Sequence, residues 1–322
     1  MPLWLNETDV RALLPMPDLI DAMQTALAAF SAGQVNQPVR SVIEVAPGHS
    51  FFASMPAHAG SIPALGAKLV TVFAGNASRN LPTHLATIVL LDPQTGELLG
   101  VMDGRFITEA RTAAVSAVAV RHLAREQAFR LAIIGSGVQA RSHLEALAHV
   151  RPFQEARCWS PTAGHVRKLA AESHPIPVRA AESAQAAVVD ADVVVLATAS
   201  PVPVIEDAWI SPGACVVSVG ACRPNQREMD PVLVARARLF VDSRAAALRE
   251  SGDVIMAISE DRFSASHIVA ELGEAVTETR LCRADAGQVV VFKSLGLAVE
   301  DLAAAHLVYQ RALEANRGAP LS

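Results

Sequence analysis

The stretch Leu131–Ala140, read LAIIGSGVQA, sets the fold that we expect for the second half of the chain. Its first four residues are apolar and predict a buried strand, and a helical pattern begins at Ala140. The loop between them, Gly135-Ser-Gly137-Val-Gln-Ala140, matches the spacing G-x-G-x-x-G/A. Between a strand and a helix, the first glycine permits a tight turn, the second lets a pyrophosphate approach the backbone, and the helix N-terminus offers N–H groups to the phosphates. The stretch therefore predicts a dinucleotide site rather than a glycine turn without a ligand.

The surrounding sequence supports this interpretation, because short apolar segments alternate with helical ones from Phe129 onward. This alternation predicts a parallel, doubly wound Rossmann sheet. In such a sheet the cofactor crevice opens at the carboxyl ends of the strands, where Thr198-Ala-Ser200 and Val219-Gly220 lie. The expected strands are Leu131–Ile134, Ala156–Trp159, Val193–Ala197, Cys215–Val219 and Leu239–Val241, with helices at Ala140–His149 and Ala163–Ala171.

The tip of the second strand bears on which nicotinamide cofactor fits. An acidic residue about 20 positions after the glycine motif binds the ribose 2′-hydroxyl of NAD and repels a 2′-phosphate. This strand instead ends in Ser160-Pro-Thr162, with Arg167 and Lys168 nearby. The pattern favours NADP(H), with NAD(H) as a second possibility. An alternative interpretation of Ser160 is that it only caps the following helix.

The first part of the chain has a different pattern. Asp18–Ala32 predicts an amphipathic helix, and Thr108–Leu123 predicts a long helix linking two domains. Asp92-Pro-Gln-Thr-Gly96 is a turn sequence between two strands. The segment Val289–Leu313 has a helical pattern that we expect to pack on the first domain. Alternating runs predict an antiparallel sheet built from Val39–Val45, Ser50–Met55, Ala64–Val72 and Ala86–Asp92.

Composition excludes several classes of function. The formal net charge of −5 and the absence of any basic run argue against nucleic acid as a partner. The longest apolar stretches, Leu85–Leu91 and Ala191–Ala199, are far shorter than the roughly 20 residues of a membrane-spanning helix. The first residues do not read as a signal peptide, and the four cysteines form no C-x-x-C pair, so we expect a cytoplasmic protein without a metal site.

Several motifs in a fixed order make the chain resemble the ornithine cyclodeaminase/μ-crystallin family over nearly its whole length. The resemblance implies a homodimer in which a split dimerisation and substrate domain flanks a Rossmann domain, and NAD(P) chemistry on small α-amino or α-imino acids. We therefore expect an α/β fold, with a Rossmann doubly wound domain at 113–290 and an α+β substrate-binding and dimerisation domain at 1–112 with 291–322. The motifs are Met55-Pro56, Gly66-Ala-Lys68, Leu81-Pro-Thr83-His84, Asp92–Gly96, Thr108–Ala114, Ile134–Ala140, Val219–Asp230 and Phe292–Gly296.

The resemblance also implies which residues bind the substrate. Its carboxylate would be held by Arg40, Lys68 and Arg111, and Lys68 would be the catalytic residue, orienting the carboxylate and supplying a proton through water. Cationic donors suit a carboxylate in a partly dry pocket, and arginine offers a planar, bidentate fork. His58 and His84 are expected as polar residues near this pocket. The residues predicted to bind the cofactor are Thr83, Arg111, Gly135, Gly137, Val138, Gln139, Ala140, Ser160, Thr162, Thr198, Ser200, Val219, Gly220 and Ser294.

Two departures from the cyclodeaminase pattern shape the predicted chemistry. Cyclodeaminases of this family carry a catalytic Asp where this chain has Cys222, and a Glu where it has Ala53. Expelling ammonia and closing a ring requires acid–base groups at the reacting nitrogen, whereas reducing an imine that is already cyclic requires fewer. Glu228 and Asp230 could take the place of these carboxylates, but the family pattern favours a structural role for both.

The favoured function is therefore NAD(P)H-dependent reduction of small cyclic ketimines, from Δ1-pyrroline-2-carboxylate to L-proline and from Δ1-piperideine-2-carboxylate to L-pipecolate. The alternatives are an ornithine cyclodeaminase, an alanine-type amino-acid dehydrogenase, and a protein that binds NADP without turnover. A Rossmann protein with unrelated chemistry remains a weaker alternative, because motifs outside the glycine loop also match the family.

Overall fold

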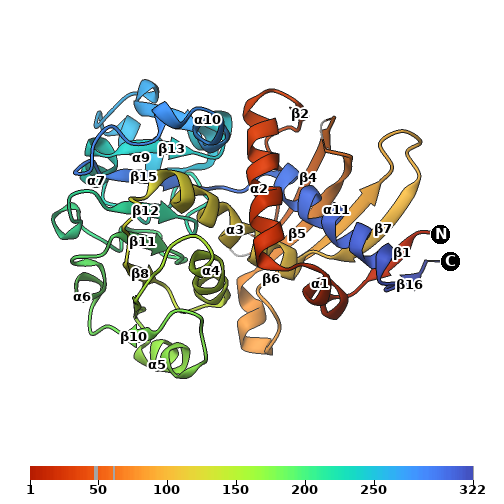
Figure 1. Cartoon of the computed structure of the whole chain (residues 1–322), viewed down its shortest axis with the longest axis horizontal. Coiled ribbons are helices and arrows are strands. Elements are labelled where there is room, and N and C mark those ends of the chain that lie inside the picture. Colours follow the sequence, from red (N-terminus) through yellow and green to blue (C-terminus); the bar gives the residue numbers. More distant parts are fainter. Residues whose placement is uncertain (47–49, 61, 322) are drawn as a thin grey trace. The chain divides into compact units, whose positions relative to one another are not determined.

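The computed structural model describes residues 1–46, 50–60 and 62–321 (Figure 1). The chain divides into two compact units. Unit 1 comprises Met1–Arg111 and Leu297–Ser322, and unit 2 comprises Thr112–Gly296. Within the described ranges, no helix combines the length and the apolar character that crossing a bilayer requires.

Unit 1 is built on a mixed sheet with the strand order β16-β1-β7-β6-β5-β4-β2, to which β3 adds by pairing with β4. The pairing is antiparallel except between β1 and β7, so the predicted antiparallel sheet is confirmed for β3 to β7. Its elements are β1 (Leu3–Leu5), α1 (Glu7–Leu13), α2 (Met16–Ser31), β2 (Val35–Asn36), β3 (Ser41–Ala46), β4 (Ser50–Ala59), β5 (Ala64–Phe73), η1 (Ala74–Arg79), β6 (His84–Leu91), β7 (Leu98–Asp103), the start of α3 (Arg105–Leu123), α11 (Ala298–Glu314) and β16 (Ala319–Pro320).

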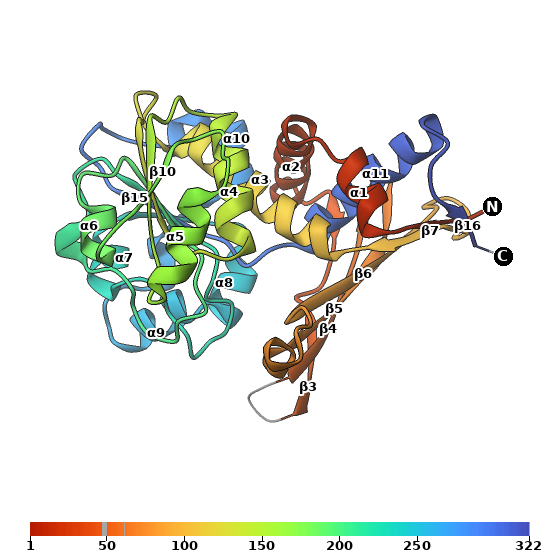
Figure 2. The same cartoon turned by 90° about the horizontal axis from the view of Figure 1, so that it is seen from below.

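One face of this sheet forms the core of unit 1. Figure 2 shows α1, α2 and α11 on the same side of the strands. Burial alternates along the strands, as expected when one face is covered. Helix α11 packs on β4, β5 and β6, and α2, with its buried apolar stripe, packs on α11. Between β6 and β7 the predicted turn is confirmed: Asp92 accepts hydrogen bonds from the N–H groups of Gln94 and Thr95, and Gly96 has a φ of 76°.

Unit 2 is a parallel sheet of eight strands in the order β10-β9-β8-β11-β12-β15-β13-β14. All residues of β11 and β12 are buried, so both faces of the sheet centre are covered, as in a doubly wound fold. The elements after α3 are β8 (Arg130–Ile134), α4 (Val138–Ala148), β9 (Glu155–Trp159), α5 (Ala163–Ala171), β10 (Val178–Ala180), α6 (Ala184–Val188), β11 (Val193–Leu196), η2 (Asp207–Trp209), β12 (Cys215–Ser218), α7 (Pro231–Arg236), β13 (Arg238–Val241), α8 (Arg244–Glu250), α9 (Gly252–Ser259), η3 (Ala265–His267), β14 (Ile268–Glu271), α10 (Leu272–Thr277), η4 (Thr279–Leu281) and β15 (Val290–Lys293).

The strand order places a topological switch point between β8 and β11. From β8 the chain adds β9 and β10 on one side and then continues with β11 and β12 on the other. A dinucleotide binds across the crevice at such a point, outside the carboxyl ends of the strands. The loops after β8, β9, β11 and β12 are therefore the ones to examine for a cofactor site.

The helical prediction for Val289–Leu313 is wrong over its first residues. Val290–Lys293 is a buried strand, β15, which pairs with β12 and β13 inside the parallel sheet. The helix begins only at Ala298, and it packs on α2 and β5 of unit 1 as expected. A short apolar run in the sheet centre is apolar on both faces, so its periodicity cannot distinguish it from the start of a buried helix.

Candidate functional site

The predicted substrate residues of unit 1 meet in a buried cluster of charges. The Nζ atom of Lys68, on β5, lies 2.6 Å from Oδ2 of Asp301. The Nε atom of Arg111, on α3, donates to Oδ1 of the same carboxylate at 3.0 Å, and its NH1 donates to Oε2 of Glu300 at 2.9 Å. The side chains of Lys68 and Arg111 are only 2% and 6% exposed, and both acids are fully buried. We call these four residues the Lys68–Arg111 cluster.

Local structure explains why the four side chains converge. The β5 register places Lys68 opposite Met55 and Ile88, on the face of the sheet that the helices cover. Glu300 and Asp301 lie in the first turn of α11, where the helix dipole favours negative charge. The sequence argument missed both acids, because an apolar helical pattern gives no reason to expect carboxylates on its buried side.

Burial sets the protonation of the cluster. It lowers the pKa of Lys68 to about 8, against the opposing effect of Asp301. Burial would raise the pKa of Asp301, but the charges of Arg111 and Lys68 hold it below the ordinary value. His84 has its pKa lowered to about 4 by burial and by the same two cations, so its imidazole is neutral near pH 7.

Arg40 and the two predicted histidines have different relations to the cluster. Arg40 is half-buried before β3, and its charge contributes to lowering the pKa of Lys68. His84 shares the covered face, because it pairs with Val72, four residues along β5 from Lys68. The expectation for His58 is wrong: its exposed side chain alternates with the buried Ala57 and Ala59 and so lies on the opposite face.

The glycine loop of unit 2 has the geometry of a phosphate cradle. Gly135 has a φ of 132°, and a Cβ there would lie 2.5 Å from the carbonyl oxygen of Ala197, so this position requires glycine. A Cβ on Gly137 would meet no atom within 4 Å, and Gly137 starts α4 without a side-chain cap. The buried Oε1 of Gln139 has no hydrogen-bond partner among the described residues. Open space, uncapped N–H groups and an unused acceptor fit a dinucleotide.

The tip of β9 is tied to this loop by hydroxyl groups. Ser136 Oγ donates to Ser160 Oγ at 3.0 Å, and Ser160 Oγ donates to the carbonyl oxygen of Thr162. Ser160 is therefore not the cap of α5, because that position belongs to the exposed Thr162. Arg141 donates to the carbonyl oxygens of Ser136 and Gly137 and forms a bidentate pair with Glu172. No carboxylate lies at the strand tip among Ser160 to Ala171.

The other predicted cofactor residues of unit 2 lie at strand ends. Thr198 and Ser200 follow β11, and Val219 and Gly220 follow β12, all half-buried. Ser294 follows β15 but is 1% exposed, and its hydroxyl group donates to Asp242 at 3.2 Å. In unit 1, Thr83 is an exposed residue before β6.

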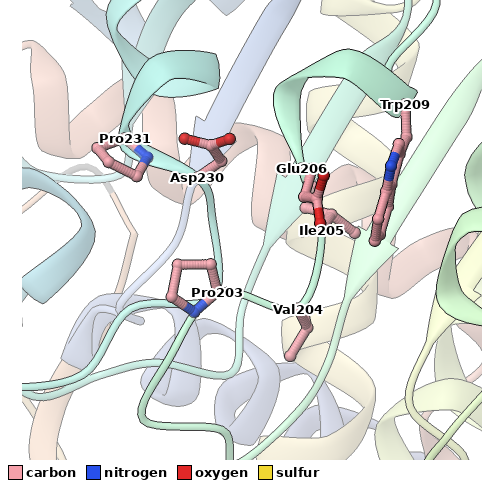
Figure 3. Close-up of a pocket in the computed structure, with 7 residues that line it drawn as sticks. All are labelled: Pro203, Val204, Ile205, Glu206, Trp209, Asp230 and Pro231. Atoms are coloured by element: carbon pink, nitrogen blue, oxygen red, sulfur yellow. The ribbon is translucent and has the colours of Figure 1, made fainter.

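Unit 2 also has a surface pocket of about 340 Å³ (Figure 3). Glu206 and Trp209 face it from one side, and Asp230 and Pro231 face it from the other. Asp230 is occupied as the cap of α7 and as the acceptor for the N–H of Asp207. None of the lining residues is among those predicted to bind substrate or cofactor.

Comparison with known proteins places this arrangement in a family. The family model of the ornithine cyclodeaminase/mu-crystallin family matches residues 2–316. The chain belongs to this family. The expected α/β fold with a Rossmann domain is confirmed by solved structures of relatives that cover nearly the whole chain.

Three relatives illustrate the similarity. Ketimine reductase mu-crystallin from Rattus norvegicus is 43% identical over 312 residues, which cover 96% of each chain. The structure of Δ1-pyrroline-2-carboxylate reductase from Thermococcus litoralis, in complex with NADH and L-proline, has a TM-score of 0.95 at 36% identity and covers 99% of this chain and 100% of that one. An archaeal alanine dehydrogenase dimer with bound NAD has a TM-score of 0.93 at 28% identity, with 100% and 99% covered.

Proposed function

We propose that this protein is an NAD(P)H-dependent reductase of small cyclic ketimines that converts Δ1-pyrroline-2-carboxylate to L-proline and Δ1-piperideine-2-carboxylate to L-pipecolate. The observation that carries the proposal is the Lys68–Arg111 cluster. The cluster brings two buried cations, Lys68 and Arg111, to one place, and the charge of Arg40 also acts on Lys68, so donors of the kind that bind a substrate carboxylate converge there. The Thermococcus litoralis relative holds NADH and L-proline, which is the product expected here.

In this proposal the residues of the cluster bind and orient the substrate. Arg111, fixed at two nitrogens by Glu300 and Asp301, offers a preorganised fork to the carboxylate, and Lys68 supplies the second cation. A lysine with a pKa of about 8 is poised to give a proton near neutral pH, so Lys68 also serves as the source of the proton for the imine nitrogen. The cofactor, when bound, supplies the hydride.

Cyclodeamination is less well supported, because the positions of the two family carboxylates hold other residues. Ala53 pairs with Val70, two residues along β5 from Lys68 and on the same buried face, so an alanine methyl group lies there in place of an acid. Cys222, in the loop after β12, donates its thiol hydrogen to the carbonyl oxygen of Val219. Neither side chain supplies a carboxylate to the reacting nitrogen.

For the cofactor we propose a preference for NADPH over NADH. The support is the acid-free tip of β9, where the hydroxyl groups of Ser160 and Thr162 lie before a helix that carries Arg167 and Lys168. Titrating NADPH and NADH separately and comparing the two values of kcat/KM tests this preference, and a higher value with NADH would refute it.

We also propose that the protein is a homodimer that uses the uncovered face of the unit 1 sheet. Leu69 and Leu85 are 37% and 43% exposed on that face, which Figure 2 shows without helices. The archaeal alanine dehydrogenase relative is a dimer. Light scattering should give twice the chain mass of 33.9 kDa for the wild type and a single chain mass for Leu85→Asp. A monomeric wild type would contradict the proposal.

The activity itself is tested by following NADPH and NADH oxidation with the two cyclic imines, with L-ornithine and NAD(P)+ as the cyclodeaminase comparison. Lys68→Ala should abolish imine reduction while cofactor binding, measured by fluorescence, persists. An unchanged kcat/KM in this variant would rule out the assigned role of Lys68. Tight NADPH binding without turnover of either imine would favour the non-catalytic alternative.

A further inference from the structure

Glu228, for which the family pattern favours a structural role, is the centre of a buried hydrogen-bond network in unit 2. Its carboxylate is fully buried and accepts five hydrogen bonds. Oε1 receives the backbone N–H and the hydroxyl of Thr198, each at 2.7 Å. Oε2 receives the N–H groups of Gly220 at 2.7 Å and Ala221 at 3.0 Å, and the hydroxyl of Ser218 at 3.0 Å.

These donors belong to the ends of two neighbouring strands. Thr198 follows β11, and Ser218 to Ala221 end and follow β12. The backbones also touch, because a Cβ on Gly220 would lie 2.1 Å from the carbonyl oxygen of Thr198 and 2.4 Å from Oε1 of Glu228. A single carboxylate thus joins the loops that follow the two strands.

Two further buried charged residues, Lys293 and Asp253, fix the position of Glu228. Lys293, fully buried on β15, donates to Ser218 Oγ at 3.0 Å, and its Nζ lies 3.3 Å from Oδ2 of Asp253. Oδ1 of Asp253 accepts the N–H groups of Glu228 and Met229. Burial opposes the charge on Lys293, but the negative charges of Asp253 and Glu228 raise its pKa above the ordinary value. The network therefore fixes both the backbone and the side chain of Glu228.

The position of the loops after β11 and β12 indicates which part of a dinucleotide they would bind. In a doubly wound sheet, the glycine loop binds the pyrophosphate and the tip of the next strand faces the adenosine ribose, which here correspond to the loop after β8 and the tip of β9. The other half of a dinucleotide would then lie across the switch point, at the carboxyl ends of β11 and β12. We propose that Glu228 is a positioning residue for the cofactor, whose carboxylate holds the backbone at Thr198 and Gly220 in the conformation that receives the nicotinamide half.

This inference rests on the use of NAD(P)H in the proposed function and adds a residue that touches neither substrate nor cofactor. The chain offers a matched control at the opposite end of β11. Asp192 precedes that strand and accepts the N–H groups of Phe129 and Arg130, each at 2.9 Å, together with Arg125 at 2.6 Å. Asp192 holds backbone N–H groups at the amino end of β8, the neighbour of β11, whereas Glu228 holds them at the carboxyl ends of β11 and β12.

The experiment compares Glu228→Gln with Asp192→Asn in the full chain. In Glu228→Gln the amide NH2 must replace one acceptor, so at least one backbone N–H loses its partner. We expect the Kd for NADPH, measured by fluorescence titration without substrate, to rise about 10- to 100-fold. The KM for NADPH should rise in parallel, while kcat at saturating NADPH changes much less. Asp192→Asn should lower the melting temperature but leave the Kd within about twofold of the wild type.

Each outcome decides the inference. Equal Kd values for the two variants, whether both unchanged or both raised, would overturn the positioning role, because only general loosening of the sheet would then remain. If Glu228→Gln does not fold, Ser218→Ala removes one of the five donors and should raise the Kd about threefold to tenfold; an unchanged Kd there also refutes the role. A wild type that binds NADPH but reduces neither imine refutes the proposed function and leaves the comparison of Kd values valid.

Discussion

Asp301 offers the most informative test of the Lys68–Arg111 cluster. Replacing it by asparagine keeps the shape of the side chain and removes the charge that contacts both cations, at 2.6 Å from Lys68 and 3.0 Å from Arg111. Glu300 would still hold one nitrogen of Arg111, whereas Lys68 would lose the carboxylate that raises its pKa. The variant therefore separates the charge of Lys68 from its position in the fold.

The size of the effect follows from burial. Breaking a fully buried ion pair costs about 3–5 kcal/mol, so Asp301→Asn should lower the free energy of unfolding by roughly that amount at pH 7. The pKa of Lys68, about 8 in the wild type, should fall further in the variant. Between the two pKa values, Lys68 is protonated in the folded wild type but neutral in the folded variant. The difference in the free energy of unfolding between wild type and variant should therefore shrink as the pH rises towards about 8.

The catalytic activity of Asp301→Asn should also fall, because Lys68 loses its positive charge in this variant. If the substrate carboxylate loses about 3 kcal/mol of binding to Lys68 and Arg111, kcat/KM for Δ1-pyrroline-2-carboxylate should fall about 100-fold at pH 7.5. The loss should be smaller at lower pH, where Lys68 regains its proton. The assays are NADPH oxidation from pH 6 to 9.5 and urea denaturation at pH 7 and 9.

A control variant on α2, at an exposed ion pair with α11, makes the test specific. Asp18 of α2 pairs with Arg311 of α11, but the Asp18 side chain is 49% exposed, so Asp18→Asn should cost at most about 1 kcal/mol and leave kcat/KM unchanged. If Asp301→Asn matched this control in kcat/KM, or if its pH profile coincided with that of the wild type, the assigned role of the cluster's charges would be refuted.

Three further predictions concern other groups. In the wild type, kcat/KM should fall as the pH rises through about 8, because Lys68 loses its proton there, and Lys68→Arg should abolish this alkaline limb; a limb that persists in Lys68→Arg would exclude Lys68 as its source. Gly135→Ala should destabilise the protein by about 1–3 kcal/mol, because Gly135 has a φ of 132° and a Cβ there would meet Ala197. Gly137→Ala should leave the melting temperature unchanged but weaken NADPH binding, because a Cβ there meets no protein atom. The reverse pattern in calorimetry and NADPH titration would contradict the roles assigned to the two glycines. Cys222 is half-buried, whereas the other three cysteines are buried, and burial raises the pKa of Cys158 to about 12 and that of Cys215 to about 11. A thiol reagent should therefore modify one cysteine, Cys222, in the native protein, and bound NADPH should slow this reaction. If mass spectrometry found a buried cysteine labelled first, the result would contradict this prediction.

The sequence could predict those features that depend on neighbouring residues. The strand, loop and helix around Gly135 follow from a local pattern, and so does the burial of Lys68 inside the apolar run of β5. β15 could not be predicted in this way, because its partners β12 and β13 are distant in sequence and its apolar residues continue into a helix.

The buried carboxylates Glu300, Asp301 and Glu228 could not be predicted from the sequence pattern for the same reason. Asp301 and Glu300 lie about 190 positions from Arg111, and an acid in a helix is expected on the solvent side. Glu228 accepts hydrogen bonds from residues at the ends of two separate strands, β11 and β12, and no spacing in the sequence predicts such a set of donors. Buried acids become visible only when the fold supplies the donors around them.

The division of the Lys68–Arg111 cluster between the two ends of the chain has a consequence for synthesis. A ribosome makes Lys68 and Arg111 early, then the whole of Thr112–Gly296, and only afterwards Glu300 and Asp301 on α11. Until that last helix emerges, the two cations lack the carboxylates that pair with them, and the sheet that carries Lys68 lacks part of its apolar cover. Unit 2, which is continuous in sequence, can complete its core first, so we expect the Rossmann fold to form before the Lys68–Arg111 cluster is complete.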